Sequence, residues 1–290
     1  MESWFFLALI PVFFWGLAAA LAKVSTQRLG IARIAFLISV IEGAIYFAGY
    51  LAFRSNIAVN VESVGIGLAS AFVGMVAYVC FYESMVEGQV AILGTISAAY
   101  PAISIVGALL LLSERLTTDE ALGLVSIMFG ILALSYERTS NPPHKIPRRS
   151  LTFALLAFLL WGFWGLTAKI ALSNIGPGNV FGCYVLSSLT IPTIYCMLRR
   201  KRQELQTLEK PSRRLWWIAA AGVALNVSGT LIFAFALNLG QASLVVPISS
   251  AYPLVTVAVA ILLLGEKLNR LQMIALVFIL IGLITLGVIS

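Results

Sequence analysis

Apolar runs, separated by short stretches that contain charges, glycines and prolines, divide the chain into ten segments. Each is close to the length of about 20 residues that a helix needs to cross the hydrocarbon core of a bilayer. The third and fourth segments, and the eighth and ninth, are the least clearly separated, so a count of nine stays open as an alternative. The pattern predicts ten membrane-spanning helices, over residues 4–24, 31–53, 64–84, 89–112, 118–136, 150–172, 179–198, 215–238, 241–264 and 269–289.

Part of the sequence occurs twice. The segment ISAAYPAISIVGALLLLSERL at 96–116 returns at 248–268 as ISSAYPLVTVAVAILLLGEKL, and eleven of the 21 aligned positions are identical at an offset of 152 residues. Nearer the start of each half, Trp15-Gly16 followed by Lys23 matches Trp161-Gly162 followed by Lys169, at an offset of 146 residues. The repetition predicts a first repeat over 1–138 and a second over 150–290, joined by a basic linker at 139–149.

Five helices in each repeat is an odd number, so the second repeat must enter the membrane upside down relative to the first. The sequence therefore predicts an all-α integral membrane protein with ten transmembrane helices in two inverted five-helix repeats. Two such halves suit alternating access, in which they rock around a shared central site, although channels also contain inverted repeats. One chain supplies both halves, so a monomer is sufficient for a transport path.

The composition agrees with a membrane protein. Of 290 residues 60 % are hydrophobic and 11 % are charged, whereas soluble domains have about 25 % charged residues. The mean hydropathy is +0.99. Three cysteines and one histidine form no metal-ligand or catalytic set, and the chain has no P-loop motif. We therefore expect a small-molecule substrate and the lipid bilayer as partners, and no enzyme activity, cofactor, metal or nucleic acid.

The net charge of +7 comes mainly from basic connectors at 137–150 and 199–214. Basic loops that flank apolar spans usually lie on the cytoplasmic side. Sixteen Lys and Arg residues fall on one side of the expected bundle and three on the other. This distribution predicts that both termini lie outside the cytoplasm, and the membrane is expected to be the plasma membrane.

Several short motifs are distributed over nearly the whole chain. They are Trp15-Gly16 with Lys23, Arg33, Gly88-Gln89, Gly240-Gln241, the Tyr100-Pro101 and Tyr252-Pro253 pairs, Ser113-Glu114-Arg115 and Gly265-Glu266-Lys267. In these features the chain resembles the EamA-type members of the drug/metabolite transporter superfamily, which have ten helices in two repeats. The resemblance implies a transporter that favours export, of amino acids, sugars, nucleotide-linked solutes or drugs. Family members are usually drawn with both termini inside, which is opposite to the charge count.

Glu42 falls near the midpoint of the second expected span. A charged group at that depth costs about 2.5–3.5 kcal/mol on insertion scales and is a functional hypothesis by default. One interpretation is a proton-coupling carboxylate that is protonated in one state and paired in another. The other is a structural acid that is hydrogen-bonded to a neighbouring helix. The second repeat shows no obvious counterpart.

Lys23 and Lys169 lie near the ends of the first and sixth expected helices, after a Trp-Gly pair in both repeats. The ordinary interpretation is that both side chains snorkel to the lipid headgroups. The functional interpretation is a symmetric pair of cations that meets an anionic group of the substrate. The residues alone leave both open.

Pro101 and Pro253 are predicted to lie inside the fourth and ninth helices and to kink them. Interrupted helices at corresponding positions of two halves are the best pointer from sequence to a transporter binding site. The alternative is that the kinks only shape helix packing. Hydroxyl groups near these kinks are candidate substrate contacts, from Ser97, Tyr100, Ser249 and Tyr252.

Further candidates for the central cavity are aromatic or polar residues within the expected spans. Trp15 and Trp161 are predicted to form aromatic walls, with Trp164 beside them. Tyr78, Tyr82 and Asn226 are polar candidates, and Glu114 and Glu266 are interpreted as helix-capping features. The function predicted from all of these is alternating-access transport of small organic solutes, amino acids or related metabolites, with proton coupling as one mode. The alternatives are a facilitative uniporter of sugars or metabolites and a flippase for lipid-linked substrates.

Overall fold

The computed structural model describes residues 2–55, 60–87, 96–135, 147–204, 211–264 and 269–289, and in these ranges the regular elements are all α-helices. A few helical side chains, that of Lys23 among them, lie outside the description. The helices are α1 (Ser3–Leu29), α2 (Ile31–Phe53), α3 (Val61–Glu87), α5 (Pro101–Leu111), α6 (Thr118–Ser135), α7 (Arg148–Glu204), α8 (Arg213–Leu239), α9 (Ala242–Ser249), α10 (Pro253–Leu264) and α11 (Arg270–Ile289).

The described helices have the length and composition of membrane spans. Seven stretches among the described residues are long and apolar enough to cross a bilayer, and the helical stretch Ile96–Leu111 is shorter but apolar. One of the seven, Arg148–Leu198, is 51 residues long and covers both the sixth and the seventh expected spans. The chain is an all-helical integral membrane protein over this part, and the count of ten spans stays a prediction.

The same backbone break separates the first two spans of each repeat. Gly30, between α1 and α2, has φ 78° and ψ 157°. Gly176, inside α7, has φ 74° and ψ 161°. Only glycine adopts this region readily. The two residues are 146 positions apart, which is the offset of the Trp-Gly pairs, so the sequence repeat is also a structural one.

Helix α2 shows how each span divides its surface between lipid and protein. Phe36, Val40 and Phe47 are exposed, as befits side chains that face lipid, whereas Ser39 and Glu42 are buried. The two sets follow the helical period of 3.6 residues on opposite faces. Polar groups of α2 are therefore directed into the bundle and away from the hydrocarbon.

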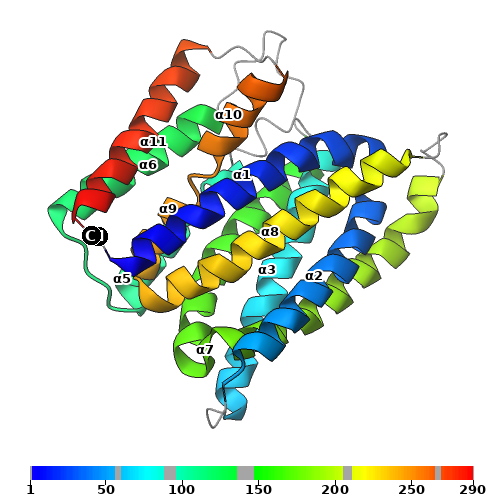
Figure 1. The fold of residues 1–290 in the computed structure, drawn as a ribbon, viewed down its shortest axis with the longest axis horizontal. Helices are drawn as coiled ribbons and strands as arrows, with labels where there is room; N and C mark the ends of the chain where they lie inside the picture. The colour runs from blue at the N-terminus through cyan, green and yellow to red at the C-terminus, as the bar shows by residue number, and fades with distance from the viewer. Residues whose placement is uncertain are drawn as a thin grey trace.

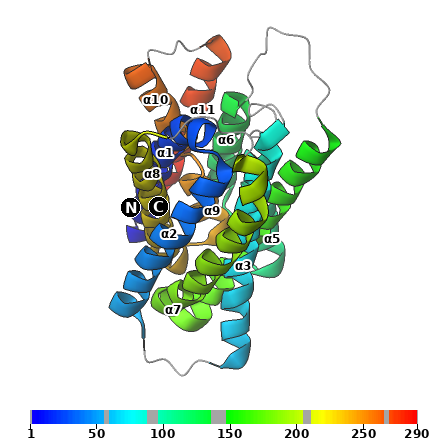
Figure 2. The same cartoon turned by 90° about the vertical axis from the view of Figure 1, so that its right-hand side faces the viewer.

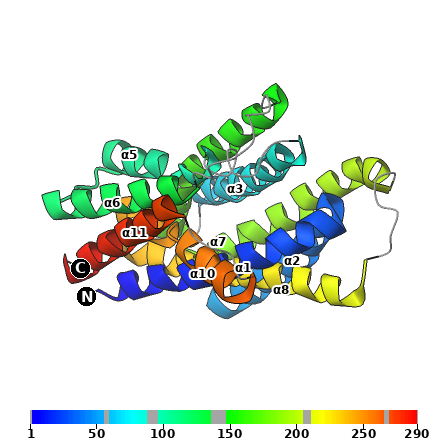
Figure 3. The ribbon, with the colours of Figure 1, turned by 90° about the horizontal axis from the view of Figure 1, so that it is seen from above.

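The two repeats pack against each other through equivalent helices. Helix α1 lies beside α8, α2 and α3 pack on α7, and α6 packs on α11 (Figures 1 and 2). The start of α1 and the end of α11 lie side by side, as Figure 3 shows from above. A Cβ atom at Gly287 would lie 2.8 Å from Cζ of Phe5, so the two chain ends are in contact at one end of the bundle.

The Trp-Gly pairs allow a close approach between repeats. The carbonyl of Gly16 in α1 accepts a hydrogen bond from Thr256 Oγ1 of α10 at 3.1 Å. The carbonyl of Gly162 in α7 accepts one from Ser104 Oγ of α5 at 2.9 Å. Donors and acceptors correspond at the sequence offsets of 152 and 146. Each glycine therefore holds the first helix of its own repeat against the fourth span of the other.

We expect Gly16→Ala to destabilise the protein. The added Cβ would lie 2.5 Å from Val255 Cβ and 2.8 Å from the carbonyl oxygen of Tyr252. Relieving these contacts requires the backbone of one helix to shift. Overpacking of this kind costs about 1–3 kcal/mol. Gly65→Ala is the matched control, because a Cβ there meets nothing within 4 Å. The measurement is thermal unfolding in detergent, followed by helical circular dichroism, and equal midpoints for the two variants would contradict this packing.

Candidate functional site

Both repeats are interrupted at their Tyr-Pro pair. Residues 96–98 are helical, 99–100 form a turn, and α5 begins at Pro101. In the second repeat α9 ends at Ser249, and α10 begins at Pro253 after a turn. The two prolines are thus the first residues of new helices, unlike the sequence expectation of kinks inside continuous ones. The first helical position tolerates proline because its N–H has no intrahelical partner.

The two interruptions are joined by side chains from opposite repeats. The hydroxyl groups of Tyr100 and Ser250 share a hydrogen bond of 2.6 Å. The Tyr100 ring centroid is 5.8 Å from that of Trp161. Symmetrically, the Tyr252 ring is 6.3 Å from Trp15 in an edge contact. Each tryptophan therefore contacts the tyrosine of the other repeat, and these four predicted residues lie around one central region.

The two predicted serines use their hydroxyl groups for packing between repeats. Ser249 Oγ donates to the carbonyl of Ala8 in α1 at 3.0 Å. Ser97 Oγ donates to the carbonyl of Ala154 in α7 at 3.5 Å. Both serines are fully buried. Their role as substrate contacts stays a prediction, and in this conformation both hydroxyls donate to neighbouring helices.

Glu42 lies at the midpoint of α2 and is 4 % exposed. Asn226 Nδ2 in α8 donates to Glu42 Oε1 at 3.4 Å. The carbonyl of Asn226 in turn accepts a hydrogen bond from Trp15 Nε1 at 3.1 Å. Tyr46 follows Glu42 by one turn on the buried face of α2, and Tyr78 packs against a hydrophobic cluster to which α2, α3 and α8 all contribute. A buried acid, an amide and hydroxyl groups are thus assembled where α2, α3 and α8 meet.

The tyrosines of α3 lie beside the aromatic residues at the first interruption. Tyr82 Oη donates to Tyr78 Oη at 3.2 Å, and the two rings form an edge contact at 4.9 Å. The ring of Tyr78 also lies 6.3 Å from that of Trp161, which contacts Tyr100. The predicted residues therefore form two sets of contacts, with Glu42, Asn226, Trp15 and Tyr252 in one and Tyr82, Tyr78, Trp161 and Tyr100 in the other.

Sequence reasoning missed three aromatic residues of the same region. Tyr184 accepts a hydrogen bond from Trp164 Nε1 at 2.9 Å, and its ring contacts Tyr46 at 5.3 Å. Phe233 lies between Trp15 and Trp164, at 5.3 and 5.4 Å. Tyr46 could have been found one turn after Glu42, on the same helix face. Tyr184 and Phe233 carry no local signal, because their partners are distant in the sequence.

Lys169 is directed at the end of α8. Its Nζ donates to the carbonyls of Leu237 and Gly240, both at 2.8 Å, and lies 3.5 Å from that of Asn238. An ammonium group has three donors, so these carbonyls account for all of them. The expectation that Lys169 meets a substrate anion stays a prediction, and in this conformation the amine caps a helix. The Lys23 side chain lies outside the described part.

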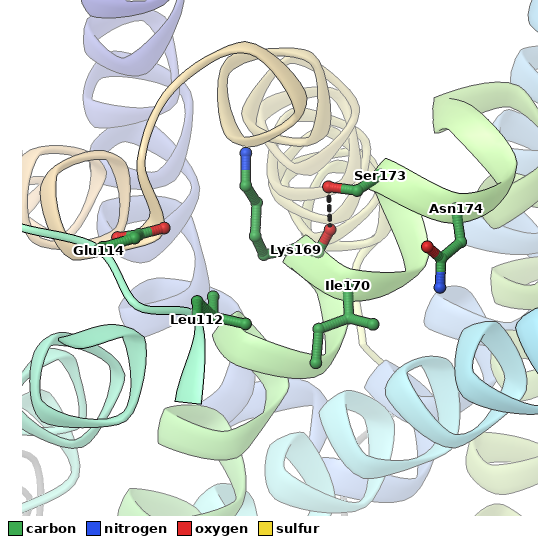
Figure 4. Close-up of a pocket in the computed structure, with 6 residues that line it drawn as sticks. All are labelled: Leu112, Glu114, Lys169, Ile170, Ser173 and Asn174. Carbon is green, nitrogen blue, oxygen red and sulfur yellow. Dashed lines mark hydrogen bonds between the residues drawn. The ribbon is translucent and has the colours of Figure 1, made fainter. Parts of the chain in front are cut away.

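An open pocket of about 390 Å³ adjoins Lys169. Its lining residues do not include Glu42 or the Asn226 that contacts it. Figure 4 shows Lys169 pointing from α7 toward the turn after α8, and Glu114 at the opposite wall beside α9. The lining residues are Leu112, Glu114, Lys169, Ile170, Ser173 and Asn174.

Comparison with known proteins adds a family and a fold. A family model described as the EamA-like transporter family matches residues 2–136 and again residues 148–288. An uncharacterized protein of Methanocaldococcus jannaschii is 33 % identical over 137 residues, which are 47 % of this chain and 97 % of that protein. A solved crystal structure superposes with a TM-score of 0.79 at 15 % identity, over 99 % of this chain and 97 % of the other. At that identity the likeness shows the fold alone.

We expect Tyr100→Phe to lower the free energy of unfolding by about 0.5–1.5 kcal/mol, the net worth of a neutral hydrogen bond. The variant removes the bond to Ser250 and keeps the ring contact with Trp161. Combined with Ser250→Ala in a double-mutant cycle, the two losses should not add. Tyr252→Phe is the control, because among the described residues the Tyr252 ring contacts Trp15 while its hydroxyl group makes no hydrogen bond. Full additivity would contradict the bridge.

Proposed function

The chain belongs to the EamA-like transporter family, and we propose that it is a secondary transporter that moves amino acids or related small metabolites by alternating access. Export is the proposed direction, in a plasma membrane. The single observation that carries the proposal is Glu42, a buried carboxylate at the centre of a span with an amide donor from the other repeat. Acids at this depth are retained for ion or substrate pathways.

The proposed coupling follows from the charge of this acid. An ionised carboxylate in a low-dielectric site needs a proton or a cationic partner, because an unpaired buried charge is strongly disfavoured. A proton on Glu42, or the ammonium group of an amino acid beside it, satisfies the same requirement. The two cargoes therefore compete for one carboxylate, and their exchange across the membrane couples solute movement to the proton gradient.

The surroundings of Glu42 supply the rest of the proposed site. Rings of Trp15 and Trp161 contact the tyrosines at the two interruptions, and they offer apolar walls for a side chain. Hydroxyl groups of Tyr78 and Tyr82 offer polar partners. Both interruptions join the repeats, so a rocking of one repeat against the other changes the geometry around this region. This supports the region as the proposed site.

We expect Glu42→Gln to abolish the response of solute flux to a pH gradient. The amide cannot take up a proton, while it keeps the shape of the side chain and a hydrogen-bond partner for Asn226. The measurement uses purified protein in liposomes with an entrapped pH dye, challenged in turn with amino acids, sugars, organic acids and amines. Wild-type protein should show coupled flux with one class of solute.

Glu62→Gln is the matched control for this experiment, because Glu62 is an exposed acid in the first turn of α3. It should behave as wild type. Undiminished pH-driven flux in Glu42→Gln would remove the coupling role. Flux that saturates with solute but ignores the pH gradient in the wild type would replace the proposal with a facilitative uniporter.

A further inference from the structure

Helix α8 ends at Leu239 and α9 begins at Ala242, so only Gly240 and Gln241 lie between them. A helix end in a membrane protein leaves carbonyl groups unpaired, and a helix start leaves N–H groups unpaired. Lys169 satisfies the carbonyl side, with two bonds of 2.8 Å. A cation at a helix C-terminus also complements the helix dipole.

Glu114 satisfies the N–H side of the same junction. Its Oε1 accepts from the Ala242 N–H at 2.8 Å. Its Oε2 accepts from the N–H and the hydroxyl of Ser243, at 2.8 and 2.7 Å. A carboxylate at a helix N-terminus is favourable both as an acceptor and through the helix dipole. The junction between α8 and α9 is thus held by one positive and one negative side chain.

The two charges come from different halves of the molecule. Lys169 belongs to the same repeat as α8 and α9, so its bonds stay within one moving unit. Glu114 follows α5 in the first repeat, so its three bonds cross from one repeat to the other. Any motion that separates the repeats at this end must break the Glu114 bonds and can leave those of Lys169 intact.

The backbone before Glu114 supports a dedicated function. Ser113 has φ 55°, the left-handed conformation that side chains other than glycine rarely adopt, and it is the only such residue among those described. The second repeat has a glycine, Gly265, at the matching sequence position. This turn carries the chain off α5, and the Glu114 N–H bonds back to the Ala108 carbonyl at 3.3 Å. The carboxylate is thereby directed at α9.

The location fits a closure of the transport path. The junction lies at the end of the bundle where the chain termini meet, since a Cβ at Gly240 would lie 2.8 Å from Trp4 Cδ2. The open pocket adjoins the junction, with Glu114 and Lys169 in its wall (Figure 4). Helix α9 is eight residues long, and its far end is the interruption beside Ser250 and Tyr252. A displacement of the first residues of α9 is therefore transmitted along one short helix to the proposed site.

We propose that the bonds from Glu114 to Ala242 and Ser243 are an inter-repeat latch that holds the terminus side of the transport path closed and releases when that side opens. The proposal rests on alternating access as the proposed function. Glu114 is a positioning residue in it, because it binds no solute and sets which side of the site is accessible. Lys169 keeps the α8–α9 junction intact while the latch opens.

The test is hydrogen–deuterium exchange on the full chain in lipid nanodiscs, without any substrate. Glu114→Gln replaces one carboxylate oxygen with an NH2 group, so either Ala242 or Ser243 loses its acceptor and the other keeps only a neutral one. The variant should raise exchange in peptides that cover 240–249 by about tenfold or more, the factor expected for losing charged hydrogen bonds. Opening this side closes the other, so exchange around the α1–α2 junction at Gly30 should fall. A helix cap without a gating role would not produce the distant decrease.

Two further variants keep the test decisive. Ser243→Ala removes one of the three bonds and keeps both backbone ones, so it should show the same changes to a smaller extent even where Glu114→Gln fails to fold. Glu120→Gln is the matched control, because Glu120 accepts from Thr117 N at 2.7 Å within its own helix start and joins no second repeat. Local exchange that rises without the distant decrease overturns the latch. Exchange is read without transport, so the latch can hold even where the flux assay rejects the proposed coupling.

Discussion

At the α8–α9 junction and at the Tyr-Pro interruption of the second repeat, groups from elsewhere in the bundle pair with the broken helix. Within a bilayer no water is available to pair a free carbonyl or N–H, and each unpaired group costs several kcal/mol. Lys169 and Glu114 serve the carbonyl and N–H groups at the α8–α9 junction, and Tyr100 bonds to the hydroxyl of Ser250 at the second interruption. Glu114 and Tyr100 belong to the first repeat, so the broken spans of the second repeat depend on the first for part of their hydrogen bonding.

The sequence repeat predicted which residues correspond, and the structure adds which of them meet. Trp15 and Trp161 align at an offset of 146 residues, and Tyr100 and Tyr252 at 152. Alignment cannot tell that Trp15 contacts Tyr252 while Trp161 contacts Tyr100. That exchange follows from the packing of α1 on α10, which depends on the glycine after the tryptophan. The sequence could predict that the two tryptophans and the two tyrosines belong to one site. It could not predict which tryptophan contacts which tyrosine, because each contact joins different repeats.

Lys169 and Glu114 illustrate where local reasoning ends. A lysine near a span end is typically interpreted as snorkelling, and a glutamate after a span as a cap. Glu114 does cap a helix, but one that starts 128 positions later. Lys169 bonds to carbonyls 68 and 71 positions away. The residue types and the repeat indicated that Lys169 and Glu114 act at helix ends. Which backbone groups they bond to could be learned only from the fold. In the sequence, Lys23, Gly88-Gln89 and Glu266 correspond to Lys169, Gly240-Gln241 and Glu114. The structure does not describe their side chains.

The two repeats share an architecture but not their polar content. The position that matches Glu42 at an offset of 146 is Ser188, whose hydroxyl bonds to the carbonyl of Val185 in its own helix. The Glu42 carboxylate thus lies at the centre without a carboxylate at the matching position, in a region where bonds such as Tyr100 to Ser250 are buried and have no water to replace them. The Glu114 bonds lie beside an open pocket, where water can take over the carboxylate and the N–H groups. Breaking a bond at the rim therefore costs less than breaking one at the centre. A bundle of this kind opens most easily at its ends while its middle stays packed.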